Sequence, residues 1–174
     1  MTEAQVKAAI QKDFNLSPEK VRVEENPSER TGVLTVTIDE LLEGAGKARV
    51  SYILGYSSKK LIQINIVWGT AIDPHVEPDR VVAAANQLLR LLLSSGYDPD
   101  TVVSNTPNRD GGVTVFQGQD ADKHMTLLRL ISGKAPMSKQ QRKEEMRAVT
   151  VALFLSYLQD ARNPDVYRLK KGQF

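Results

Sequence analysis

Apolar side chains recur with two different periods in the first part of the chain. Thr2 and Gln5 fit a helix capping box, and the apolar residues from there to Phe14 recur three or four apart, as on one helical face. From Val21 the period becomes two, and it stays two through GVLTVTID at 32–39. The pattern predicts a first helix followed by two strands, or by one long interrupted strand.

The middle of the chain contains a predicted hairpin and a predicted core helix. Alternation resumes at 48–56 and again at 61–68, on either side of a polar turn, which predicts two antiparallel strands. Two prolines in 73–79 end this part of the sheet. The apolar residues of 81–93 then follow the helical period with few polar interruptions, and Gly96 fits a helix C-cap. We expect this helix at the centre of the core.

The last part of the chain predicts a hairpin and a final helix. Residues 97–112 are rich in Asp, Pro, Asn and Gly and read as a long connection, and 113–117 and 125–131 read as strands. Ser138 and Gln141 fit a second capping box. A long helix is predicted after it, with one apolar stripe made of Met146, Val149, Thr150, Leu153, Tyr157 and Leu158.

These elements predict an α+β fold. We expect an antiparallel β-sheet of about five strands with three helices, in the order α-β-β-β-α-β-β-α, and the helices should cover one face of the sheet. The length suits a single domain, which we place at residues 1–162, with a C-terminal tail at 163–174. We find no internal repeat of the solenoid type.

The composition of the chain argues against several classes of function. The 23 basic and 21 acidic residues nearly balance, so the whole molecule has no field that would attract a nucleic acid or a membrane. There is no cysteine, which excludes disulfides, thiolate nucleophiles, zinc fingers and iron–sulfur clusters. Residues 1–14 lack the organisation of a signal peptide, and 81–93 is too short to cross a bilayer. We expect a cytoplasmic protein with no membrane insertion.

The two histidines are the candidate acid–base residues. His75 lies in DPHVEPD at 73–79, where Asp73 and Glu77 add oxygen ligands, so a metal-dependent or small-ligand enzyme using this loop is one alternative. His124 follows two aspartates in a predicted hairpin loop, where a turn-forming role explains the aspartates better than calcium binding does. Neither histidine has an obvious catalytic companion, so no catalytic residue, metal or cofactor is predicted.

A basic segment gives another alternative. It could neutralise several phosphates, but acidic residues dilute it and no aromatic residues are interleaved to stack on bases. A solvated helix face is the simpler interpretation, and a nucleic-acid partner is not favoured. The segment consists of Lys134, Lys139, Arg142, Lys143 and Arg147.

The order of elements from Thr2 to Leu158 resembles the type III secretion chaperone-like (YbjN-like) architecture, which also includes bacterial proteins with no secretion role. The resemblance implies a homodimer that offers a sheet face or a helix groove to a protein partner and has no catalytic residues. We therefore expect a non-catalytic, chaperone-like or adaptor domain that binds its partner through an apolar strand face or edge. The candidate surface residues are Tyr56, Ile62, Ile64, Ile66 and Trp68, unless the opposite face is the one left uncovered.

Overall fold

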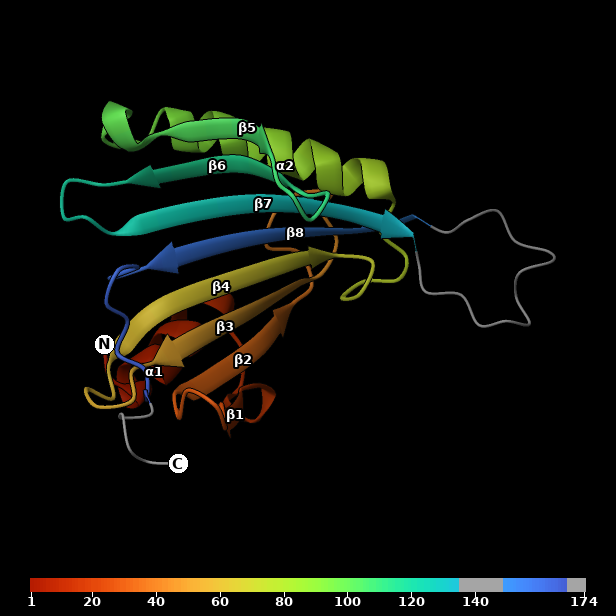
Figure 1. The fold of residues 1–174 in the computed structure, drawn as a ribbon. Helices are drawn as coiled ribbons and strands as arrows, with labels where there is room; N and C mark the ends of the chain where they lie inside the picture. Colours follow the sequence, from red (N-terminus) through yellow and green to blue (C-terminus); the bar gives the residue numbers. More distant parts are fainter. Residues whose placement is uncertain (135–148, 169–174) are drawn as a thin grey trace.

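A computed structural model of the chain describes residues 1–134 and 149–168, which form one antiparallel sheet of eight strands and two α-helices (Figure 1). The prediction of about five strands and three helices is therefore wrong, although the α+β class is right. The strand order across the sheet is β1-β2-β3-β4-β8-β7-β6-β5. The first elements are α1 (Glu3–Phe14), a 3-10 turn (Pro18–Lys20), β1 (Arg22–Glu25), β2 (Gly32–Ile38), β3 (Ala48–Leu54) and β4 (Leu61–Gly69). They are followed by α2 (Pro78–Leu93), a second 3-10 turn (Pro99–Thr101), β5 (Val103–Pro107), β6 (Val113–Gln119), β7 (Met125–Lys134) and β8 (Val149–Leu158).

The element order repeats once. Each half of the chain has a helix, a 3-10 turn that begins with proline, and four strands. The strand order reads the same from both edges once β1 to β4 are matched with β5 to β8, and β4 pairs with β8 at the middle. The two halves are therefore related by an approximate two-fold axis, and β4 and β8 form the central strand pair.

The prediction of a final helix is wrong for residues 149–158, which form strand β8. Val151, Leu153 and Leu155 alternate with residues of the other face and are at most 3% exposed. Both periods fit this apolar run, because residues two apart and residues three or four apart are both apolar. Pairing with β4 on one side and β7 on the other buries the run as a strand. The capping box at Ser138 and Gln141 lies outside the described residues.

Both helices cover the same face of the sheet, as Figure 1 shows, and each one builds its own core. The capping box at Thr2 confirms the predicted start of α1, whose buried residues pack on β2 and β3. The predicted helix at 81–93 is also confirmed, and α2 packs on β6, β7 and β8 together with Trp68 of β4. Within the described ranges, no helix is long and apolar enough to span a membrane.

The other face of the sheet carries no helix from the described residues. The register places Arg49, Val67, Phe154 and Arg129 side by side across four adjacent strands of this open face. Its residues are mostly half-buried, and both apolar and small polar side chains occur there. The open face is thus a second surface, distinct from the side on which the helices pack.

The chain after β8 returns to the first half of the fold. Asp165 reaches the turn between β3 and β4, where its carboxylate accepts hydrogen bonds from the backbone N–H of Ser57 (3.0 Å) and Ser58 (2.8 Å). The Tyr167 ring packs edge-on against Tyr56, with ring centroids 5.3 Å apart. Residues 163–168, predicted to belong to a tail, therefore lie against the hairpin turns of the first half.

Replacing Asp165 by asparagine is expected to lower stability in a pH-dependent way. Hydrogen bonds from the Ser58 hydroxyl and from the Ser57 and Ser58 backbone lower the pKa of Asp165 to about 2. An aspartate in an unfolded chain has a pKa of about 3.9, so the ionised carboxylate stabilises the fold above about pH 4, and this contribution is lost as pH falls toward about 2. We expect a loss of about 1 kcal/mol at neutral pH, since the group is partly solvated.

Thermal unfolding of the native chain and of Asp165→Asn between about pH 2 and pH 7 measures this contribution. The difference in melting temperature should be constant above about pH 5 and should shrink in acid. Asp122→Asn, at an exposed position in another turn, is the matched control. A difference between native and Asp165→Asn chains that does not change with pH would contradict the assignment.

Candidate functional site

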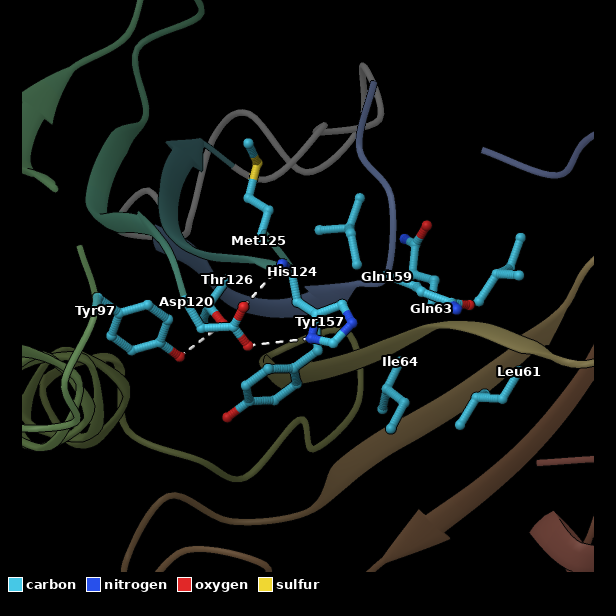
Figure 2. A pocket seen from close by; sticks show the side chains of 12 residues that line it. Leu61, Gln63, Ile64, Tyr97, Asp120, His124, Met125, Thr126, Tyr157 and Gln159 are labelled. Carbon is cyan, nitrogen blue, oxygen red and sulfur yellow. Dashed lines mark hydrogen bonds and ion pairs between the residues drawn. The ribbon is translucent and has the colours of Figure 1, made fainter. Parts of the chain in front are cut away.

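A pocket of about 440 Å³ lies at the end of the sheet where β4 begins and β8 ends (Figure 2). We call it the end pocket. Its walls are partly apolar, from Leu61, Ile62, Ile64, Met125 and Leu158, and its polar lining comes from Gln63, Thr126 and Gln159. Tyr97, Tyr157, Asp120 and His124 complete it. A concave, mostly apolar site with a few converging polar groups is the usual form of a binding site.

The tight turn between β6 and β7 positions His124. Oδ1 of Asp120 accepts the backbone N–H of Asp122 and of His124, both at 2.9 Å, which closes the turn. Oδ2 of Asp120 lies 3.1 Å from Nδ1 of the His124 ring. Burial alone would raise the pKa of Asp120, but the hydrogen bonds from His124 and Asp122 and the charge of His124 lower it below its usual value. Asp120 therefore acts as an ionised partner that orients the imidazole.

Two tyrosines from different parts of the second half complete the pocket. The Tyr97 hydroxyl donates a hydrogen bond to Oγ1 of Thr126 at 2.7 Å, and its ring packs edge-on against Phe116 with centroids 5.0 Å apart. Tyr157, on β8, is 39% exposed. Burial raises the pKa of the Tyr157 hydroxyl, with a smaller contribution from Tyr97, so Tyr157 is neutral at physiological pH and can donate a hydrogen bond.

The Asp120–His124 pair can be compared with a catalytic arrangement. A histidine oriented by a carboxylate is one part of a nucleophile-activating set, which also needs a hydroxyl or thiol in hydrogen-bond contact with the ring. Of the residues the structure describes, only Asp120 is hydrogen-bonded to the His124 ring. The described residues also contain no group of three side chains that could hold a metal ion.

His75 lies at the opposite end of the sheet from His124. It lines a second cavity of about 840 Å³ next to the segment between β4 and α2, together with Glu77 and residues of β7 and β8. Asp73 accepts the backbone N–H of His75 at 3.1 Å and that of Lys47 at 3.2 Å, so its carboxylate has a structural role. The two histidines therefore do not converge on one pocket.

The five residues proposed as a protein-binding surface are distributed over several environments. Trp68 is 2% exposed inside the core, and Ile66 packs against both cores. Ile62 and Ile64 line the end pocket, whereas Tyr56 lies at the β3–β4 turn with Tyr167. The basic segment cannot be placed, because only the backbone of Lys134, at the end of β7, belongs to the described residues. Lys139, Arg142, Lys143 and Arg147 lie outside them.

Both edges of the sheet are poorly suited to accept a further strand. Edge strand β1 is short and carries Arg22, Glu24 and Glu25. Edge strand β5 contains Asn105 with a positive φ of 48° and ends at Pro107. Charges, prolines and local distortion are the features by which natural sheets prevent strand addition. A partner is therefore better accommodated by a pocket or a face than by an edge.

Sequence reasoning misses most residues of the end pocket, among them Tyr97, Thr126, Tyr157 and Gln159. The sequence pattern places Tyr157 on the stripe of a helix and Tyr97 in a long connection. Thr126 and Gln159 give no signal, because each is a common residue type without a motif. The signals that the sequence does give are the alternation of Ile62 and Ile64 and His124, which Asp120 precedes at a distance that suits a tight turn.

Comparison with protein families, with curated proteins and with solved structures gives no match for this chain.

Proposed function

We propose that this chain is a non-catalytic, chaperone-like or adaptor domain, and that its protein partner is bound at the end pocket. The observation that carries the proposal is a concave site with apolar walls and two tyrosines, next to a histidine that has no nucleophile in contact among the described residues. Aromatic side chains with one polar end are enriched at the centres of protein interfaces. The pocket therefore has the chemistry of a site that accepts side chains of another protein.

An enzyme that uses His124 is the second candidate, because Asp120 orients the ring as it would in a catalytic pair. Such an enzyme would need a nucleophilic group or an activated water molecule that arrives with the bound substrate. The expected homodimer remains a prediction, and we propose the open face around Val67 and Phe154 for it because no helix of the described residues covers that face.

Selection of random peptides displayed on phage against the purified chain tests the proposed function. We expect enrichment of a shared sequence motif whose binding is weakened about tenfold by Tyr157→Ala, since one buried aromatic contact is worth about that factor. Leu91→Ala, on the solvent side of α2 where Leu91 is 60% exposed, is the matched control and should bind normally. No enriched motif, or a motif indifferent to Tyr157→Ala, would rule out the end pocket as the protein-binding site.

A further inference from the structure

The cores built by the two helices meet on the helix side of the central strand pair, where Ile66 packs against both of them. We call this line between the two cores the groove. At the end of the groove near Trp68, the connection between β2 and β3 fills it. Ala45 of this connection is fully buried in the core built by α2, and Leu42 packs against the same core. Leu41 packs against both cores, so it lies between them. We call residues 39–47 the filling segment.

Contacts within the filling segment and to a neighbouring connection hold it in place. The backbone N–H of Lys47 donates to Asp73 in the connection after β4, and within the segment the Lys47 ammonium forms an ion pair with Asp39 at 2.8 Å. Gly46 has a φ of 73°, and a side chain there would contact Asp73 and Val76 too closely. The leucines and Ala45 thus fill this end of the groove, and Gly46 lets the backbone of the segment approach Asp73 and Val76 closely.

The matching connection in the second half does not fill its end of the groove. Under the approximate two-fold axis, the filling segment of nine residues corresponds to the turn at 120–124, which has five. Residues 121–124 are all exposed. Trp68 and Tyr157 occupy matching positions on β4 and β8 under this axis. Trp68, at the filled end, is 2% exposed, whereas Tyr157, at the other end, is 39% exposed. The end pocket is the part of the groove that the shorter turn leaves open.

We propose that the end pocket binds a short leucine-containing segment of a partner protein, with small residues next to the leucines, as the filling segment has. This inference rests on the proposed function and names the chemistry of the partner. The apolar walls from Leu61 and Ile64 suit aliphatic side chains, as the opposite end of the groove does. The amide of Gln159 offers donors and an acceptor for the backbone of a bound segment.

A synthetic peptide with the sequence of residues 39–48, DELLEGAGKA, is the probe, and isothermal titration calorimetry measures its binding to the full chain. A short flexible peptide loses much of its contact energy to ordering, so we expect a Kd of about 0.1 to 1 mM. The same peptide with both leucines replaced by serine should not bind. Tyr157→Ala should weaken binding about tenfold, because it removes an aromatic wall.

A second variant separates loss of the pocket from loss of the fold. Gln159→Trp places a large side chain at an exposed position of the rim and should block the peptide while the circular dichroism spectrum and melting temperature stay unchanged. Leu91→Ala should bind the peptide as the native chain does. Binding that persists in Gln159→Trp, or that does not depend on the leucines, overturns the inference.

The outcomes also distinguish this inference from the proposed function. If phage selection yields a motif without leucine and its binding is weakened by Tyr157→Ala, the end pocket still binds protein, but the inference of a leucine-containing segment is refuted. Absence of both an enriched motif and peptide binding would refute both. Self-association that Tyr157→Ala abolishes would identify the occupant as a second copy of this chain, and the partner-segment inference would be wrong.

Discussion

Replacement of Leu155 by alanine is expected to lower the free energy of unfolding by about 2 to 5 kcal/mol, the range for truncating a buried leucine. Leu155 is 3% exposed, and its neighbours in register are Ile66 on β4 and Leu128 on β7. Truncation leaves a cavity under α2, because all three strands belong to a continuous sheet that cannot collapse into it. Urea unfolding followed by circular dichroism measures the loss.

This substitution separates the strand from the helix predicted for the same residues. On a helix with the stripe of Leu153 and Tyr157, Leu155 would point to solvent, and alanine there would be nearly neutral. Ser156→Ala, on the open face, is the matched control and should change stability by less than about 0.5 kcal/mol. A loss for Leu155→Ala as small as that of its control would contradict the central position of β8.

Replacement of Gly69 by alanine is expected to cost about 2 to 4 kcal/mol, combining backbone strain with a steric clash. Gly69 ends β4 with a φ of 127°, a conformation that other residues rarely adopt. An added Cβ would overlap the carbonyl oxygen of Val151 and would lie 2.8 Å from Cα of Ala152. The two halves of the sheet would have to separate locally to accept it.

Gly111→Ala distinguishes the two contributions. Gly111 also has a positive φ, of 81°, but no atom of the described residues lies within 4 Å of the place where its Cβ would be. It should therefore show the strain alone, about 1 kcal/mol. Equal losses for the two variants in the same urea titration would mean that β4 and β8 do not approach each other as closely as the structure has them.

The elements predicted correctly from the sequence are those whose signals are local. The capping box at Thr2 and the periodicity of 81–93 place both helices, because a helix forms its hydrogen bonds within one segment. The hairpin of β3 and β4 is also predicted, since strict alternation surrounds a polar turn. The lack of cysteine excludes every site that needs a thiolate, because this conclusion depends on composition and not on the fold.

The elements that the sequence pattern misses are those whose identity depends on distant neighbours. Strand β5, at 103–107, is exposed along its whole length and too polar to give an alternating pattern. Strand β8 is missed for the opposite reason, since its apolar run fits a helix as well as a strand. The repeat of the two halves also escapes detection, because the matched connections at 39–47 and 120–124 differ in length.

The sequence by itself determined the local periods, the two helices and the hairpin. Tertiary structure alone decided that Val149–Leu158 is a central strand, because burial between β4 and β7 selects between two periods that the residues satisfy equally well. It also decided the end pocket. Tyr97, His124 and Tyr157 meet there because the register pairs Tyr157 with Thr126, two residues after His124, and the Tyr97 hydroxyl donates a hydrogen bond to Thr126.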